Sequence, residues 1–291
     1  MSKATVYFTK EITPEAIIKL YKALNHPLPG KVAVKISTGE FNNPHYLAPK
    51  LIKPIIDELH GTIVECNTAY PGKRDTTKDH WHTIEAHGFK AIAPCDIMDE
   101  EKEMSIPVKD GFHLKENFVG EHLKNYNSIL MLSHFKGHPM GGYGGALKNM
   151  SIGIASSYGK SHIHCVGDFH GKFEELFHQN QDHFLESMAD ADRAVVDYMK
   201  GEIVYINVAN NLSIDCDCVD KPKPPEMKDI GIYASVDPVA LDQACCDAII
   251  NSDDPGKKSF VERLNKQHGL HLIEAAEKLG LGTRQYEIVN L

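Results

Sequence analysis

Short apolar runs rich in β-branched residues alternate along the chain with longer stretches in which apolar residues recur every three or four positions. The apolar runs predict strands, which lie at 4–8, 31–37, 62–66, 127–135, 202–209, 229–235 and 286–291. The periodic stretches predict helices, one after Thr13 and others at 46–61, 76–88, 183–201, 235–250 and 270–280. Because strands and helices alternate through the first half, we expect an α/β fold with a mostly parallel mixed sheet and helices on both faces.

Two of the predicted helices begin with a capping side chain that is followed by proline. Thr13 precedes Pro14, and Asp237 precedes Pro238. In this order the cap accepts a hydrogen bond from the first turn, and proline fixes the first helical φ angle. Neither an internal repeat nor a clear linker divides the sequence. We therefore expect a single domain over residues 1–291, with two α/β lobes as the alternative.

The stretch 134–149, HFKGHPMGGYGGALKN, combines glycines with metal- and anion-binding side chains directly after the most apolar strand. Ligands of α/β sheets bind outside the carboxyl ends of the strands, where glycines can leave backbone N–H groups open to an anion. His134 or His138 could serve as metal ligand or general base, and Lys148 could hold an anionic group. Further candidate ligand-binding residues of the stretch are Gly141, Gly142, Gly144, Gly145 and Asn149. The alternative is a plain strand-to-helix turn.

Cysteine and histidine patterns supply the candidate metal ligands. Cys216 and Cys218 flank Asp217, a spacing at which two thiolates can share one metal. A complete site would need further ligands, and His134 is the candidate from the glycine-rich stretch. The alternative is two inert thiols at a strand end. A second cluster, HIHCVGDFH at 162–170, is either a two-histidine pair on an extended strand or a set of solvated side chains.

Composition narrows the classes of partner and compartment. Lys and Arg total 31 against 40 Asp and Glu, a net charge of −9, which disfavours nucleic acid as a partner. No stretch has the length and apolar character of a signal peptide or a membrane span. Seven cysteines, two of them adjacent, do not form a secreted disulfide framework. We expect a cytoplasmic protein with free thiols, a small-molecule ligand and no membrane contact; a homo-oligomer is an open alternative.

Four stretches of the sequence resemble the widespread prokaryotic family known as domain of unknown function 362. They are KISTGEFNNPHYLAPKLIKPIID (35–57), NTAYPGKRDTTKDHWHTIEAHGF (67–89), LSHFKGHPMGGYGGALKNMSIG (132–153) and CDCVDKPKPPEMKDIGIYASVDPVALDQACCDAI (216–249). The family's motif residues, carried over by position, are Lys35, Gly39, Arg74, His134, Gly145, Lys148, Asn149, Cys216, Cys218, Asp229, Ser235, Asp237 and Asp242. The resemblance implies that Lys35, Arg74 and Ser235 bind the ligand together with the glycine-rich stretch.

Many members of that family carry a ferredoxin-type module with CxxCxxCxxxC spacing before the last motif. The corresponding region here, 160–200, is a variable insert that holds a single cysteine, Cys165. Ferredoxin-type 4Fe-4S clusters are therefore not expected.

A shorter resemblance links residues 138–148 to the nickel-pincer lactate racemase family. In that family a lysine holds the cofactor and histidines do metal and proton work. The resemblance implies a racemase-like enzyme as one alternative.

The leading hypothesis is a metal- or cofactor-assisted activity on a small anionic ligand, with a redox reaction as one form of it. The site would combine the glycine-rich stretch, Cys216, Cys218 and the helix that starts after Asp237, with Asp242 facing the ligand. Since no flavin or nicotinamide motif occurs, a redox reaction would need a metal to carry the electrons. The competing hypothesis is a non-catalytic ligand-binding or accessory protein derived from iron–sulfur relatives.

Overall fold

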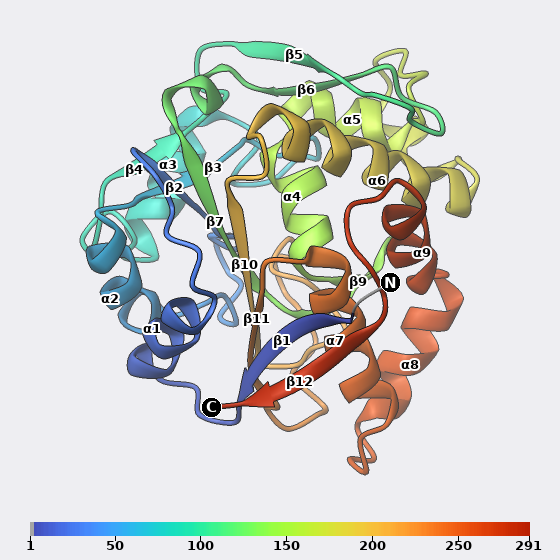
Figure 1. The fold of residues 1–291 in the computed structure, drawn as a ribbon. Helices are drawn as coiled ribbons and strands as arrows, with labels where there is room; N and C mark the ends of the chain where they lie inside the picture. The colour runs from blue at the N-terminus through green and yellow to red at the C-terminus, as the bar shows by residue number, and fades with distance from the viewer. Residues whose placement is uncertain (1–2) are drawn as a thin grey trace.

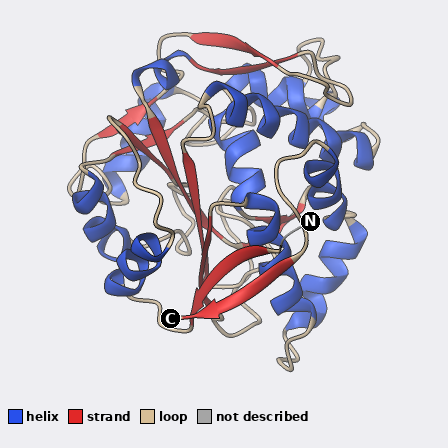
Figure 2. Ribbon diagram, viewed as in Figure 1, coloured by secondary structure: helices blue, strands red, loops and turns tan. Residues whose placement is uncertain are grey.

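A computed structural model, which describes residues 3–291, places one eight-stranded sheet through the centre of the molecule (Figure 1 and Figure 2). From edge to edge the strands are β12 (Tyr286–Asn290), β1 (Ala4–Thr9), β11 (Gly231–Ser235), β10 (Ile203–Ala209), β7 (Ser128–His134), β2 (Val32–Lys35), β3 (Thr62–Glu65) and β4 (Cys95–Ile97). Strand β11 is antiparallel to both of its neighbours, and the other pairings are parallel. The predicted α/β class with a mostly parallel mixed sheet is confirmed.

Helices cover both faces of this sheet and give the molecule two apolar cores. One core contains side chains of α1 (Pro14–Ala23), α2 (Pro49–Leu59) and α3 (Thr77–Ala86). The other contains side chains of α4 (Ala146–Ile154), α5 (Ser157–His164), α6 (Gln181–Tyr198), α7 (Pro238–Ile250), α8 (Lys257–Lys266) and α9 (Leu270–Lys278). Successive residues of β7 enter opposite cores, Leu130 one and Met131 the other, because neighbouring side chains of a strand point to opposite faces.

Both predicted helix caps are present. The Thr13 hydroxyl accepts a hydrogen bond from the backbone N–H of Ala16 at 3.1 Å, and Asp237 accepts one from the N–H of Ala240 at 2.9 Å. Proline follows each cap at the start of its helix. These contacts lie within four residues of chain, so the local sequence was enough to predict them.

The glycine-rich stretch is a short β-hairpin and not an open loop, which corrects the sequence-based expectation. Its strands are β8 (Lys136–His138) and β9 (Gly142–Gly144). A Cβ on Gly137 would lie 2.5 Å from the backbone of Ile214, and Gly142 has a φ of +81° with its own Cβ position 2.9 Å from the Cα of Gly269. These glycines are therefore required by close packing of backbone on backbone, and their N–H groups do not form an open anion-binding loop.

The region 160–200 forms helical structure that packs into the second core. It contains the end of α5, the short 3-10 helix η2 (Phe173–Phe177) and all of α6. His162 and His164 lie on α5 and are both buried, so the extended-strand interpretation of this cluster is wrong. A second antiparallel pair, β5 (Glu103–Pro107) with β6 (Glu116–Gly120), was not predicted. Within residues 3–291, no helix has both the length and the apolar character needed to cross a membrane.

Candidate functional site

A cavity of about 300 Å³ lies at the carboxyl ends of β2, β3 and β7. The last residues of these strands, Lys35, Glu65 and His134, all line it. The β8–β9 hairpin, the first turns of α4 and the Cys216–Cys218 segment form further walls. The cavity thus occupies the place where parallel α/β sheets usually bind ligands.

Most of the side chains that were predicted to bind or react meet at this cavity. Its lining includes Lys35, Arg74, His134, His138, Gly144, Gly145, Lys148, Asn149, Cys216 and Cys218. Segments as far apart in the chain as Lys35 and Cys218 are therefore brought together, as the leading hypothesis requires. Their chemical roles stay predictions.

Five predicted ligand-binding residues lie outside the cavity lining and have other partners. Asp242 is fully buried and accepts hydrogen bonds from the N–H groups of Ala146 and Leu147 at 2.9 and 3.0 Å, so it caps α4. Asp237 caps α7, and Ser235 donates to the carbonyl of Thr5 at 2.8 Å. Gly141 and Gly142 belong to the turn of the β8–β9 hairpin and its second strand. The polar atoms of Asp242, Asp237 and Ser235 thus have partners within the protein, and the ligand-binding role of these residues stays a prediction.

The cavity carries an excess of positive charge although the chain is acidic overall. Five cationic side chains line it, Lys35, Arg74, Lys136, Lys148 and Lys160, against the two carboxylates of Glu65 and Asp217. The whole chain has a net charge of −9. A local concentration of cations in a poorly hydrated cavity attracts anions more strongly than the same charges would at the surface.

Lys35 and Arg74 are paired with a buried carboxylate. Lys35 Nζ lies 2.7 Å from Glu65 Oε2, and Arg74 Nη1 lies 3.3 Å from Glu65 Oε1. Arg74 Nε also donates to Glu40 at 2.9 Å. Burial opposes ionisation of Glu65, but Lys35 and Arg74 outweigh it and lower the pKa of this carboxyl to about 2. Glu65 therefore fixes the positions of two cations at the cavity wall.

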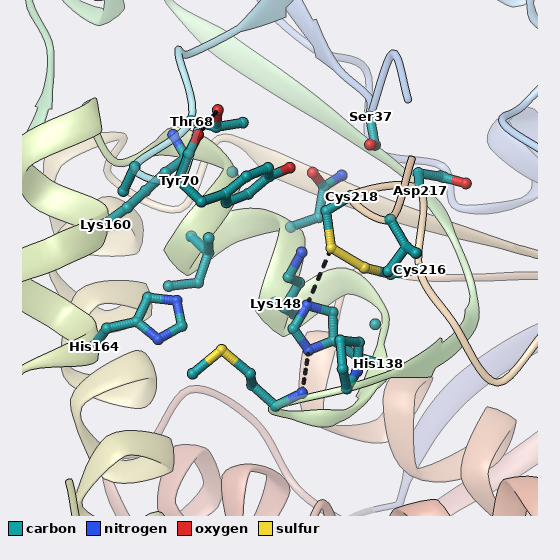
Figure 3. A pocket seen from close by; sticks show the side chains of 18 of the residues that line it. Ser37, Thr68, Tyr70, His138, Lys148, Lys160, His164, Cys216, Asp217 and Cys218 are labelled. Carbon is teal, nitrogen blue, oxygen red and sulfur yellow. Dashed lines mark hydrogen bonds between the residues drawn. A yellow bond between two sulfur atoms is a disulfide. The ribbon is translucent and has the colours of Figure 1, made fainter. Parts of the chain in front are cut away.

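Lys148 differs because its ammonium group faces the cavity without a partner (Figure 3). Among residues 3–291, none accepts a hydrogen bond from Lys148 Nζ or forms an ion pair with it. Burial, and then the nearby charges of Lys35 and Arg74, lower the pKa of Lys148 to about 8. The group is still mostly protonated near neutral pH, so an uncompensated positive charge is available to a ligand.

His134 belongs to a buried ion cluster with Asp217 and Lys136. Its Nδ1 lies 3.1 Å from Asp217 Oδ2, and its Nε2 donates to the carbonyl of Asn210 at 2.7 Å. Lys136 Nζ lies 2.5 Å from the other carboxylate oxygen. Burial opposes ionisation of Asp217, but Lys136 and His134 hold its pKa well below the usual range. Both ring nitrogens of His134 face acceptors inside the protein, so a metal-ligand or general-base role would require one of these two contacts to break.

His138 is held in one tautomer by the turn of the hairpin. Its Nδ1 accepts hydrogen bonds from the N–H groups of Met140 and Gly141, at 3.2 and 2.9 Å. The proton of the neutral ring must then lie on Nε2, which is 3.6 Å from the sulfur of Cys218. Burial and the charge of Lys148 hold the pKa of His138 well below its usual value. The ring is therefore neutral and directs an N–H group at Cys218.

Cys216 and Cys218 form a disulfide, which corrects the expectation that both are free thiols (Figure 3). Their Cα atoms are 5.2 Å apart. The ligand atoms of His138, Cys216 and Cys218 lie within 4.8 Å of one another, so this group could hold a metal ion. A disulfide offers no thiolate, so the predicted metal role can apply only to the reduced pair. The other five cysteines, Cys66, Cys95, Cys165, Cys245 and Cys246, are free.

Several side chains of the cavity were not predicted from the sequence. Glu65 and Lys136 are charged residues at or directly after apolar strands, a signal that such charges are either paired or functional. Asp217 was interpreted only as the residue between two cysteines. The sequence also did not predict an apolar wall, because its members come from the hairpin turn and from separate helices; they are Met140, Ile152, Phe173, Leu176, Phe177, Phe184 and Met188.

Comparison with solved structures gives remote similarities. The chain is similar to the lactate racemase apoprotein from Thermoanaerobacterium thermosaccharolyticum, at 12% identity and a TM-score of 0.48, over 84% of this chain and 57% of that one. It is also similar to a crystal structure of a protein from Thermotoga maritima, at 12% identity and a TM-score of 0.39, over 93% of this chain and 60% of that one. The chain spans less than two thirds of either protein. No curated protein matches the chain.

A family model matches most of the chain. The match covers residues 32–247 and is described as Domain of unknown function (DUF362). It runs from β2 into α7 and includes every described residue that lines the cavity. The cavity is thus a feature of the matched region, and the chain belongs to the family described as domain of unknown function (DUF362).

Proposed function

We propose that the cavity binds a small organic anion and that Lys148 pairs with its negative charge. The observation that carries this proposal is the half-buried Lys148, whose ammonium group faces the cavity with no hydrogen-bond acceptor or ion-pair partner among residues 3–291. A charge that is removed from water without a partner is unfavourable. An anionic ligand would compensate that charge at the place where the protein leaves it open.

The surroundings of Lys148 favour an organic anion over an inorganic one. Its charged neighbours Lys35 and Lys136 already have carboxylate partners, so one ligand charge is enough to balance Lys148. Phe184, Met188 and the η2 segment form an apolar wall of the same cavity. A volume of about 300 Å³ lies at the small end of the range for ligand sites. The ligand class is a small carboxylate or phosphate ester with an apolar part.

Binding of such anions is tested with Lys148→Met, which keeps the length and apolar stem of the side chain but removes the charge. We expect small carboxylates or phosphate esters to raise the melting temperature of the wild-type protein and to have no such effect on the variant. The variant itself should be at least as stable as the wild type, since it no longer holds an unpaired charge at a half-buried position. Isothermal titration calorimetry measures the loss of affinity directly.

The matched control is Lys172→Ala, which removes an exposed lysine next to the η2 segment. This control should bind the anion with the affinity of the wild type. Equal affinity of the Lys148→Met variant and the wild type would refute the proposal, as would a panel of anions that leaves the wild-type melting temperature unchanged.

A second candidate is a metal-assisted form of the same activity, in which the reduced Cys216 and Cys218 bind a soft metal ion together with His138. The 4.8 Å spacing of their ligand atoms supports it. The hydrogen bonds of Met140 and Gly141 to His138 Nδ1 oppose it, because the Nε2 lone pair needed for the metal is then protonated. The test is to measure the metal content of the reduced wild-type protein and of a Cys216→Ser/Cys218→Ser variant. Equal metal content in the two proteins would refute this candidate function.

A further inference from the structure

We propose that Cys216 and Cys218 form a redox-active dithiol–disulfide pair that exchanges electrons with small thiols and disulfides, with Cys218 as the attacking thiol. This inference does not depend on which anion Lys148 binds. It replaces the metal that a redox reaction was expected to need, because the pair can itself carry two electrons.

The sulfur of Cys218 is the one that a small molecule reaches first. Both cysteines line the cavity, but Cys216 is only 5% exposed, whereas Cys218 is half-buried. A reagent small enough to enter the cavity therefore meets Cys218 and leaves Cys216 as the resolving thiol. Large protein disulfides are excluded as partners by the size of the cavity, about 300 Å³.

His138 provides the feature that makes Cys218 reactive once the pair is reduced. The backbone N–H groups of Met140 and Gly141 fix the His138 tautomer, so Nε2 presents a proton at 3.6 Å from Cys218 Sγ. A hydrogen bond donated to sulfur favours the thiolate over the thiol, and the thiolate is the attacking form. Lys148 lines the same cavity, and its positive charge also favours the thiolate.

The pair is also held in place while its redox state changes. Asp217, between the two cysteines, is fixed by Lys136 at 2.5 Å and His134 at 3.1 Å. Asn43 donates from Nδ2 to the carbonyl oxygens of Cys216 and Val219 at 3.2 and 2.8 Å. None of these contacts involves a sulfur atom, so the segment keeps its position in both states. A disulfide between residues two apart closes a very short loop and adds little as a structural cross-link.

Cys66 is a natural comparison within the same cavity. It also lines the cavity, but its thiol donates to the carbonyl of Ile154 at 3.4 Å. Burial raises the pKa of the Cys66 thiol well above its usual value. Cys66 should therefore be inert under conditions in which Cys218 reacts.

The reaction balances with a low-molecular-weight thiol, RSH, as the reductant. The thiolate RS⁻ attacks Cys218 Sγ, the Cys216–Cys218 bond breaks, and Cys216 leaves as a thiolate that takes up a proton. A second RS⁻ then attacks the R sulfur of the mixed disulfide, releases RSSR and leaves Cys218 as the thiolate. Two thiols are oxidised to one disulfide, and the protein disulfide gains two electrons. Of the two protons that the thiols release, Cys216 takes up one and the other passes to solvent, because Cys218 is left as the thiolate. The reverse sequence oxidises the dithiol with RSSR.

In the first test, the protein is equilibrated in a series of buffers with different ratios of reduced to oxidised glutathione. Free thiols are then alkylated, and mass spectrometry determines the redox state of each cysteine. We expect Cys216 and Cys218 to change together and reversibly within this series, while Cys66 stays reduced throughout. A mixed disulfide should be trapped on Cys218 in a Cys216→Ser variant. A pair that stays unchanged across the whole series, or a Cys218 that forms no mixed disulfide, would overturn the proposal.

The second test measures the role of His138 in the Cys216→Ser background. The rate of iodoacetamide modification of Cys218 as a function of pH should give a pKa below that of an ordinary thiol, about 8.5. Adding His138→Asn removes the ring Nε2–H while Oδ1 can still accept from the hairpin turn, and should slow the reaction at pH 7 by about tenfold. Melting temperatures identify any variant that fails to fold. An unchanged rate in a folded variant, or modification no faster than that of Cys66, would contradict the inference.

Discussion

At the scale of single residues, the lysines of the cavity differ in their partners. Lys35 pairs with Glu65, Lys136 pairs with Asp217, and Lys160 donates to the carbonyl of Ala155 at 2.6 Å. Lys148 has no partner of this kind among the described residues, and burial together with neighbouring cations lowers its pKa to about 8. Lys148 is therefore the lysine of the cavity whose protonation changes near neutral pH and whose charge a ligand can compensate.

The pH dependence of anion binding follows from this pKa. Lys148 is protonated in the free protein below pH about 8 and loses its proton above it. Because only the protonated form pairs with an anion, the association constant should be constant below pH about 7 and fall by up to about tenfold per pH unit above pH about 8. Calorimetric titrations between pH 6 and 10 measure the association constant at each pH.

Lys148→Arg is the control for the pH dependence, because a guanidinium stays charged throughout this range. Its affinity should show no loss around pH about 8. A wild-type affinity that is flat up to pH about 10 would show that Lys148 does not pair with the ligand.

At the scale of elements, the ends of adjacent parallel strands bring opposite charges together in a buried place. β2 ends with Lys35 and β3 ends with Glu65, and Arg74 joins them from the segment before α3. An isolated charge at any of these positions would be strongly unfavourable, whereas here Glu65 and Glu40 together balance the two cations. The wall of the cavity at these strand ends therefore depends on paired charges, with Glu65 in contact with both cations.

Glu65→Gln should destabilise the protein by about 3–5 kcal/mol at pH 7, because it leaves the buried Lys35 without its carboxylate partner and removes one of the two carboxylates that pair with Arg74. The folded-state pKa of Glu65, about 2, lies below its reference value of 4.5. Its stabilisation is therefore fully present above pH about 4.5 and is lost as the pH falls toward about 2. Urea unfolding at pH 7 and at pH 3 should show a smaller difference between wild type and variant at the lower pH.

The matched control for this effect is Glu101→Gln, at an exposed position. It should change the free energy of unfolding by less than about 0.5 kcal/mol. A Glu65→Gln variant as stable as this control would mean that Lys35 and Arg74 do not need the carboxylate.

In the whole molecule, the cavity is formed by segments from the beginning, the middle and the end of the chain. Lys35 and Glu65 come from the first third of the chain, the β8–β9 hairpin from its middle, and Cys216–Cys218 from its last third. Two apolar cores on opposite faces of the sheet hold these parts in position. The scaffold, and not the short disulfide, should therefore supply the stability of the site.

Reduction of the Cys216–Cys218 disulfide should lower the free energy of unfolding by no more than about 2 kcal/mol, since the loop that it closes contains three residues. Urea unfolding with and without dithiothreitol measures this difference, and the Cys216→Ser/Cys218→Ser variant should match the reduced protein. A loss of 4 kcal/mol or more, on the scale of a long-loop cross-link, would identify the disulfide as structural.

The class of fold and the two helix caps could be predicted from the amino-acid sequence, as could a cavity lined by the end of the glycine-rich stretch and by Cys216 and Cys218. Hydrophobic periodicity indicates which residues are buried and so distinguishes helices from strands. The caps of Thr13 and Asp237 close within one helical turn, and cavities of parallel sheets lie at the carboxyl ends of the strands. The four stretches that carry the family resemblance also lie within or overlap the matched region.

The contacts of each polar residue at the cavity, in contrast, depend on the tertiary structure. Asp242 caps a helix and lies outside the cavity lining because the N–H groups of residues almost a hundred positions earlier in the chain donate to it. The tautomer of His138, the unpaired state of Lys148 and the disulfide beside them depend in the same way on which atoms come within about 3–4 Å. Those distances arise from packing of segments far apart in the chain, which no local pattern records.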